Sequence, residues 1–203
     1  MPKRNALKEP IKHRISNLKL VGCVMSGLQL ELYNSLALDA DTDSFNQKSR
    51  MCSNIVFPLT EEDGGRERIL SVTNYIGATG FNRIFKNGAS KRALYSLNDP
   101  FELSIFSKRN LEKYSTKINK IIEHIESHLK EKKSGIIFIY SQWIKSGILP
   151  IAMALEFLGF KKWSAKQEKP LLEKSKKKSV GSYIIISGEK SLSDNIYKDY
   201  IKV

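Results

Sequence analysis

Apolar residues recur along the chain with regular spacings, and the clearest case lies in residues 135–160. Residues 136–140 form an unbroken apolar run, which predicts a strand buried on both faces. Pro150 suits the first turn of a following helix, and Gly159 suits the left-handed position after its end. The segment therefore predicts a strand–loop–helix unit of an α/β sheet, in which the carboxyl ends of the strands carry the site.

The same patterns predict elements elsewhere in the chain. Residues 114–129 carry apolar side chains at helical spacing, with Ser115 as the cap. Ser26 and Gln29 match a capping box, which predicts a helix with Leu28, Leu32 and Leu36 on one face. Pro58 makes the apolar residues 55–59 a poor central strand. Further expectations are strands over 18–25 and 183–187, loops over 38–50 and 61–68, irregular structure with short helices over 69–110, and a short helix over 191–201.

Positive charge is concentrated in two stretches of a chain whose net charge is +13. Residues 1–19 hold six basic residues against one glutamate, a net of +5, and residues 161–178 hold eight lysines against two glutamates, a net of +6. Such a balance favours an anionic partner, nucleic acid before a membrane, although lysine-rich runs also serve as solvated segments. We expect a disordered basic arm over 1–17, a mixed region over 18–110, and an α/β lobe over 111–203 with a lysine-rich linker over 161–181.

Several kinds of chemistry find little support in the sequence. Cys23 and Cys52 form no CxxC pair and are typical of buried thiols in a reducing, intracellular compartment. His124 and His128 have the i,i+4 spacing of metal ligands, but a place on a surface helix near its C-terminus explains them as well. No phosphate-binding GxxxxGK[ST] loop is present, and no apolar run is long enough to span a membrane.

Five stretches carry a resemblance to a known family, in order along the chain. They are 20–33 (LVGCVMSGLQLELY), 50–58 (RMCSNIVFP), 111–118 (LEKYSTKI), 135–160 and 183–189 (YIIISGE). Together they resemble the superfamily 2 helicases of large nucleocytoplasmic DNA viruses, the group around the small subunit of the poxvirus early transcription factor. Residues 135–160 are similar to helicase motif IV with its following helix, and 183–189 to the next strand with its Gly-Glu turn.

This resemblance implies an α/β fold, an incomplete RecA-like C-terminal helicase lobe with a mostly helical preceding region. ATP and Mg²⁺ are the family's cofactors. The first lobe, with its Walker A loop, and motifs V and VI have no counterpart here, so we expect no catalytic residues, no cofactor and no ATPase activity in this chain alone. The resemblance and the charge together suggest these nucleic-acid-binding residues: Tyr140, Ser141, Gln142, Gly188, Glu189, Lys174, Lys176, Lys177 and Lys178.

The sequence thus predicts the nucleic-acid-binding portion of an ATP-dependent viral helicase or helicase-like early transcription factor. Expected partners are DNA or RNA, the remaining helicase lobe from a neighbouring reading frame, and viral RNA polymerase, in the host cytoplasm or virus factory and in the virion. Two alternatives remain open: a non-catalytic protein-interaction platform on viral transcription machinery, and a decayed gene fragment. At the level of single residues, Tyr140 could instead pack in the core, and Gly188 could simply end a strand.

Overall fold

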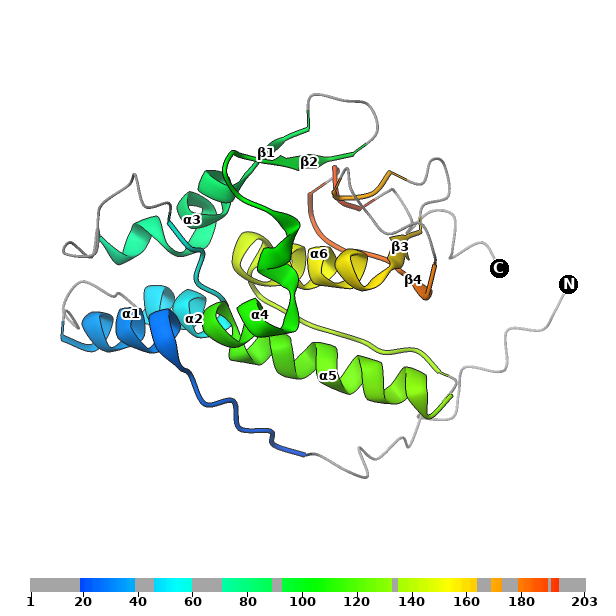
Figure 1. Cartoon of the computed structure of the whole chain (residues 1–203), viewed down its shortest axis with the longest axis horizontal. Helices are drawn as coiled ribbons and strands as arrows, with labels where there is room; N and C mark the ends of the chain where they lie inside the picture. Colours follow the sequence, from blue (N-terminus) through cyan, green and yellow to red (C-terminus); the bar gives the residue numbers. More distant parts are fainter. Residues whose placement is uncertain are drawn as a thin grey trace, which may run out of the picture.

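The computed structural model describes residues 19–38, 46–59, 71–88, 93–132, 135–163, 169–172, 179–189 and 191–193. Helices dominate these ranges (Figure 1): α1 (Gly27–Leu38), α2 (Gln47–Asn54), α3 (Gly77–Ile84), α4 (Lys108–Tyr114), α5 (Thr116–Lys130) and α6 (Leu149–Leu158). Short 3-10 turns occupy Val72–Asn74 (η4) and Leu103–Phe106 (η5), and a π turn occupies Ile144–Ile148 (η6). Helices combined with small sheets agree with the predicted α/β class at this coarse level.

The described strands form two small sheets of two strands each. β1 (Phe85–Asn87) and β2 (Tyr95–Leu97) pair antiparallel, whereas β3 (Phe160–Lys162) and β4 (Gly181–Tyr183) pair parallel. The hairpin β1–β2 lies within 69–110, where we expected irregular structure and short helices. The short helices are confirmed by η4, α3 and η5, while the hairpin is an addition to that prediction.

Helix α6 lies at the centre of the molecule, as its sequence leads one to expect (Figure 1). Every residue from Leu149 to Glu156 is buried, which is typical of a helix with apolar residues on all sides. Pro150 stands in the first turn, and Gly159 ends the helix with φ 104°, in the left-handed region that glycine tolerates. The predicted helix and both of its ends are therefore confirmed.

Helix α5 is the predicted amphipathic helix. Ser115 Oγ accepts a hydrogen bond of 3.0 Å from the Ile118 amide, which confirms the predicted cap. The side chains of Ile118, Ile122 and Ile125 are buried in the main core, and the opposite face of the helix is exposed. Since α6 contributes most of its residues to the same core, α5 and α6 pack together as one helix layer.

Helix α1 is confirmed, but the predicted capping box is wrong. Gln29 is fully buried, its Nε2 donates to the Cys52 carbonyl at 2.9 Å, and its Oε1 accepts from the Thr116 amide at 3.2 Å. The Ser26 hydroxyl donates to the Glu112 carbonyl instead of capping α1. Gln29 therefore joins α1 to α2 and α5, because a buried amide must find partners wherever the fold supplies them.

A second, smaller core lies beneath α1 and α2. It contains Leu32, Leu36, Cys52, Val56, Tyr75 and Ile76. Burial raises the pKa of the Cys52 thiol to about 12, so this cysteine is the inert buried thiol that we expected, whereas Cys23 is half-buried. The predicted loop over 38–50 is wrong at its end, since α2 begins at Gln47. The turn over 61–68 lies outside the described residues.

The predicted strands are mostly wrong. Residues 19–25 form no strand, and residues 136–140, which we call the first apolar segment, are extended but pair with no strand in the part of the chain described. Their side chains are not buried on both faces, since Ile136 is 98% exposed, Phe138 81% and Tyr140 79%. In the run predicted as a strand over 183–187, only Tyr183 pairs; residues 184–187 form the second apolar segment. A strand needs a neighbour for its backbone hydrogen bonds, and neither segment has one there.

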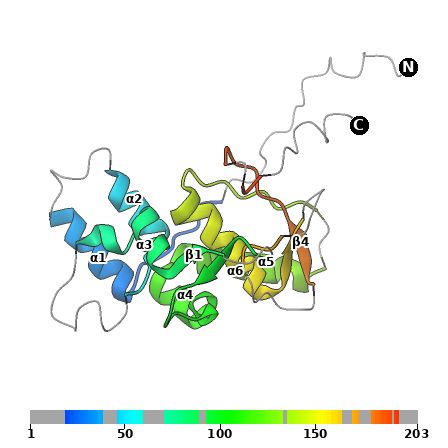
Figure 2. The same ribbon diagram turned by 90° about the horizontal axis from the view of Figure 1, so that it is seen from above.

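The extended segments lie on one side of the helix layer. Seen from above, the trace of 135–142 and the chain following β4 run along the same side of α5 and α6 (Figure 2). Ile139 and Ile185 point into the main core, where they pack against these helices. The opposite faces of the segments carry exposed apolar side chains, among them Phe138 and Ile186.

The lysine-rich linker is anchored at its middle by a buried carboxylate. Glu156 on α6 accepts hydrogen bonds from the amides of Leu171 at 2.8 Å and Leu172 at 2.9 Å, and from the Tyr183 hydroxyl at 2.7 Å. Burial raises the pKa of Glu156, although these bonds and Lys162 act in the opposite direction. The linker is thus tied to α6 at Leu171 and Leu172 and to the β3–β4 sheet at both ends.

Replacing Glu156 by glutamine should destabilise the fold. The Leu171 and Leu172 amides donate to different oxygens of the carboxylate, and glutamine replaces one of these oxygens by an NH2 donor. One buried N–H group therefore loses its partner, at a cost of about 1–3 kcal/mol in the free energy of unfolding. Urea titration followed by circular dichroism measures the difference. Glu112→Gln, at an exposed position of α4, is the matched control and should change stability by less than about 0.5 kcal/mol. Equal effects of the two variants would contradict the proposed anchor.

Candidate nucleic-acid interface

Each apolar segment ends in the same serine turn. Ser141 Oγ accepts from the Trp143 amide at 3.2 Å and donates to the Trp143 carbonyl at 3.2 Å. Ser187 Oγ accepts from the Glu189 amide at 3.2 Å and donates to the Glu189 carbonyl at 3.4 Å. Serine side chains favour such turns because they replace a backbone partner two residues further along. The two predicted site stretches therefore share one local geometry.

The loop that follows Ser141 is held firmly in place. The Ile148 amide donates to the Trp143 carbonyl at 3.0 Å, which closes the π turn η6. Ser146 is buried, and its hydroxyl accepts from the Gly77 amide at 2.9 Å, which ties the loop to α3. Gly147 packs so tightly on Ser141 that an added Cβ would clash with the serine side chain, reaching 2.9 Å from its Cβ. These contacts fix the loop before any ligand arrives.

Most predicted site residues of the described chain lie at the surface. Tyr140, Gln142, Gly188 and Glu189 are exposed, and Ser141 is half-buried. The alternative in which Tyr140 packs in the core is wrong, since its ring is mostly in solvent. The Ser141 hydroxyl is engaged within its own loop, so its structural part is to shape the turn that presents Gln142.

Residues of α3 and β2 contact residues close to the two turns. Lys145 of η6 donates to Asn82 Oδ1 at 2.9 Å, and its Nζ lies 5.7 Å from the centre of the Phe81 ring. The Phe81 ring meets the Tyr95 ring edge-on, with 5.4 Å between their centres. Burial raises the pKa of Tyr95, and the negative charge of Glu189 adds to the effect, which places that carboxylate near β2. The fully buried Phe81 ring thus lies between Lys145 and Tyr95, and these contacts link the regions of the two turns through the core.

Sequence reasoning missed these connecting residues. Lys145 follows the predicted loop by only three positions, and its charge in an otherwise apolar stretch was a usable signal. Glu156 was likewise the lone charged residue of an apolar helix, which is a recognisable sign of a buried, bonded group. Tyr95 gave no signal, because the chain only brings it to this surface through the β1–β2 hairpin.

The four predicted lysines Lys174, Lys176, Lys177 and Lys178 lie outside the described residues. Leu172, which precedes them in the sequence, is buried and forms a parallel bridge with Tyr95.

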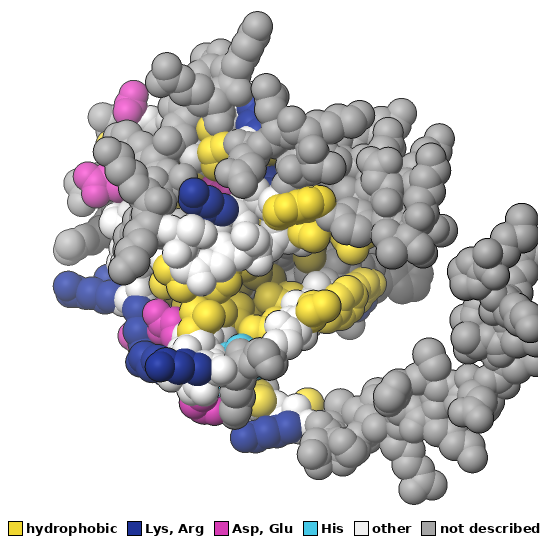
Figure 3. All heavy atoms as spheres, turned by 90° about the vertical axis from the view of Figure 1, so that its right-hand side faces the viewer, with side chains coloured by type: hydrophobic (Ala, Val, Ile, Leu, Met, Phe, Trp, Pro, Cys, Tyr) yellow, Lys and Arg dark blue, Asp and Glu magenta, His cyan; other side chains and the backbone are white. Residues whose placement is uncertain are grey.

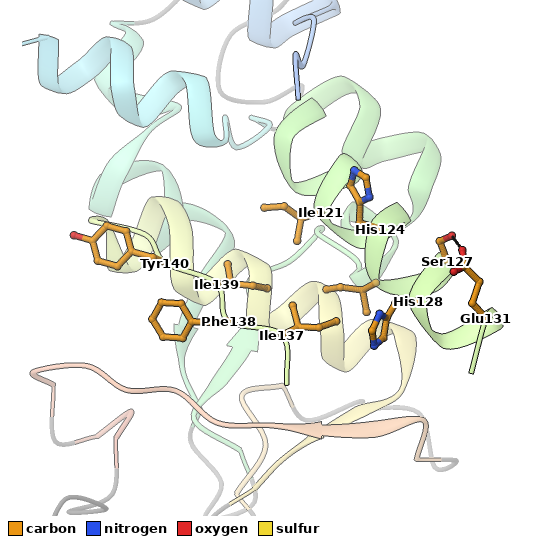
Figure 4. Close-up of a pocket in the computed structure, with 10 residues that line it drawn as sticks. Ile121, His124, Ser127, His128, Glu131, Ile137, Phe138, Ile139 and Tyr140 are labelled. Atoms are coloured by element: carbon orange, nitrogen blue, oxygen red, sulfur yellow. Dashed lines mark hydrogen bonds between the residues drawn. The ribbon is translucent and has the colours of Figure 1, made fainter. Parts of the chain in front are cut away.

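A cavity of about 570 Å³ lies between α5 and the first apolar segment (Figure 4). Ile137 and Ile139 point toward α5, while Phe138 and Tyr140 point away from it. His124 and His128 line the helical wall, and Ser127 donates to Glu131 at 3.1 Å. Among the described residues no three His, Cys, Asp or Glu side chains are grouped to hold a metal ion. The histidines fit the simpler interpretation of a surface position near the end of α5.

Comparisons with known proteins add no relative: no family model, no curated protein and no solved structure matches this chain. Within the described residues, no helix is long and apolar enough to cross a membrane. The functional interpretation therefore depends on the sequence motifs and on the geometry of this surface.

Gly147→Ala should destabilise the loop and the fold. The new methyl group would displace Ser141 and open its turn, at a cost of about 1–3 kcal/mol in the free energy of unfolding. Gly22→Ala is the matched control, because an added Cβ there meets no atom within 4 Å. Thermal melts of both variants measure the effect. A Gly147→Ala melt that coincides with that of the control would show that the loop is not closely packed.

Proposed function

We propose that this chain is the nucleic-acid-binding portion of an ATP-dependent helicase or helicase-like early transcription factor of the large-DNA-virus type. In this proposal the fold is an incomplete RecA-like C-terminal lobe. The observation that carries it is the pair of matching serine turns that follow two extended apolar segments, with Tyr140, Gln142 and Gly188 exposed. The carboxyl ends of strands are where α/β sheets bind ligands, and the motif IV resemblance falls on the same residues.

The surface residues suit a single-stranded backbone. Gln142 offers amide donors to phosphate or sugar oxygens, and the exposed ring of Tyr140 offers a face for base stacking. Lys145 follows Gln142 by three residues, and its ammonium group donates to Asn82. The lysine run supplies further positive charge in the sequence. Glu189 repels phosphate but accepts hydrogen bonds from a base amino group or a ribose hydroxyl. In this proposal the lysines supply most of the affinity and the turns supply the orientation.

ATP hydrolysis would require groups from elsewhere. Phosphoryl transfer needs a metal, a phosphate-binding lysine loop and an arginine together, and the sequence has no recognisable loop of that kind. The proposal therefore assigns ATP and Mg²⁺ to a complex with the remaining helicase lobe, and assigns binding to this chain. The chain alone is expected to release no phosphate from ATP, with or without nucleic acid.

A second candidate is the non-catalytic interaction platform, for example on a viral RNA polymerase. The bare apolar segments favour it, since Ile136, Phe138 and Ile186 are exposed without a partner in the described chain. Large exposed apolar surfaces are typical of protein–protein interaction sites. The two candidates use neighbouring parts of the same segments: the apolar positions for a protein partner, and the turn from Tyr140 to Gln142 for nucleic acid.

Binding to a labelled single-stranded oligonucleotide should depend steeply on salt. With roughly four to six phosphate contacts at a log–log slope of about −0.7 each, affinity should fall about a hundredfold between about 50 and 200 mM salt. Replacing Lys174, Lys176, Lys177 and Lys178 by alanine should flatten this slope without changing sequence preference. Fluorescence anisotropy across a salt series measures both. No binding by the wild-type chain at low salt would contradict the proposal.

Replacing Gln142 by alanine in the same experiment should weaken binding by about three- to tenfold at every salt concentration and leave the slope unchanged. The reason is that a neutral hydrogen bond releases no counterions. Gln47→Ala, an exposed glutamine on α2, is the matched control and should bind like the wild type. Equal loss in the two variants would mean that the serine turn does not meet the nucleic acid.

A further inference from the structure

The two apolar segments have open backbone edges. Within the described residues, no strand pairs with 136–140, and no backbone hydrogen bond joins this segment to another part of the chain. β4 pairs with β3 along one edge only, and the residues that follow, 184–187, continue without a strand partner. Unpaired backbone donors and acceptors along an exposed extended segment are hydrated, and they can pair with a strand added from another chain.

The side chains of both segments alternate in the manner of strands from the interior of a sheet. Ile139 and Ile185 point into the main core, while Phe138 and Ile186 point to solvent. Apolar residues on both faces are typical of parallel strands that are covered on both sides. The sequence of each segment therefore fits a sheet that is more complete than the one in the isolated chain.

The exposed sides of the two segments face outward and could receive an added strand. Both segments run in the same direction, from the end near β4 toward the serine turns, on the same side of α5 and α6 (Figures 1 and 2). The side on which they begin is hollowed, and hydrophobic side chains line the hollow (Figure 3). A strand that paired with the edge of the first segment would also cover apolar side chains next to this hollow.

We propose that this face accepts one uncharged, apolar β-strand donated by a different polypeptide, which completes the sheet. The chemistry of the edges identifies the ligand. Residues 136–142 and 183–188 include no charged side chain, although the chain carries 34 lysines and arginines. Nucleic acid would find no cation along these edges, and a charged strand would bury an unpaired charge. Only an extended peptide supplies both backbone hydrogen bonds and apolar side chains.

A second copy of this chain fits the face less well. Its own apolar segments are packed on its helix layer through Ile139 and Ile185, so they cannot enter the hollow of a neighbour without leaving their own core. Edge-to-edge contacts between copies would leave the hollow unfilled, and head-to-tail contacts would continue into open chains. A foreign strand closes the sheet in a one-to-one complex. This inference does not depend on nucleic-acid binding.

The test uses the full chain and a fluorescein-labelled ten-residue peptide of alternating valine and threonine. This peptide is uncharged and strand-forming, and an otherwise identical peptide with alternate residues replaced by proline cannot donate the same hydrogen bonds. Anisotropy titrations should show saturable one-to-one binding of the first peptide and binding at least about tenfold weaker for the proline peptide. Analytical ultracentrifugation of the chain alone, at the same concentrations, should show a monomer.

Two matched variants locate the site. Ile136→Lys places a charge beside the open edge and should weaken peptide binding by about tenfold or more. Leu20→Lys is the control, because Leu20 is also 98% exposed but lies outside both segments. Neither change alters a buried residue, so both variants should have the melting temperature of the wild type. A difference in peptide affinity between them then reports binding alone.

Three outcomes would overturn the proposal. The first is no peptide binding by a folded, monomeric chain. The second is equal binding of the two peptides, or equal loss in the two variants, which would indicate nonspecific hydrophobic contact. The third is a concentration-dependent assembly that Ile136→Lys abolishes, which would assign the face to a second copy of the chain.

Discussion

A strand forms only where the N–H and C=O groups of an extended segment find a neighbouring strand, and the rest of this structure depends on that constraint. Residues 136–140 and 184–187 have the composition of buried strands, yet the described chain offers them no strand partner. Helices α5 and α6 can cover only one face of these segments, and they cannot supply a backbone ladder. Among the described residues, the fold is therefore well packed on its helical side and leaves two extended segments without a strand partner on the other.

What keeps the extended side in place is a small set of polar contacts around α6. Glu156 ties the linker and Tyr183 to the central helix, so the second segment starts from a fixed point. Ser146 and Gly77 do the same for the loop after the first segment. Both segments then end in serine turns. Each segment therefore combines an unpaired apolar backbone edge with an exposed polar turn at its carboxyl end. In our proposal the edge binds protein and the end binds nucleic acid.

The sequence predicted those parts of the fold that depend on local chemistry. The apolar period and the Ser115 cap located α5, and Pro150 with Gly159 located both ends of α6, because each signal acts within a few residues. The strands could not be predicted in the same way, since a strand forms only when another segment reaches it. Gln29 shows the same limit, because its capping pattern was local while its actual partners, Cys52 and Thr116, lie far along the chain.

The candidate site shows the same contrast between residues that a local pattern predicts and residues that only tertiary contacts bring together. The motif resemblance identified Gln142 and Gly188, which the structure places at the surface, but it gave no indication of Lys145 or Tyr95. Tyr95 is brought toward Glu189 by the β1–β2 hairpin, a tertiary arrangement that no local pattern encodes. The lysine run was visible from composition alone, whereas the bonds from the Leu171 and Leu172 amides to Glu156 required the structure.

Amide hydrogen exchange of the isolated, monomeric chain, followed by NMR, tests the central claim most directly. If the sheet is incomplete, the amides of 136–140 should exchange within about tenfold of unstructured rates, while amides in α6 exchange only on global unfolding. Protection of 136–140 equal to that of α6 would show that the segment already has its partner, and would contradict the incomplete sheet.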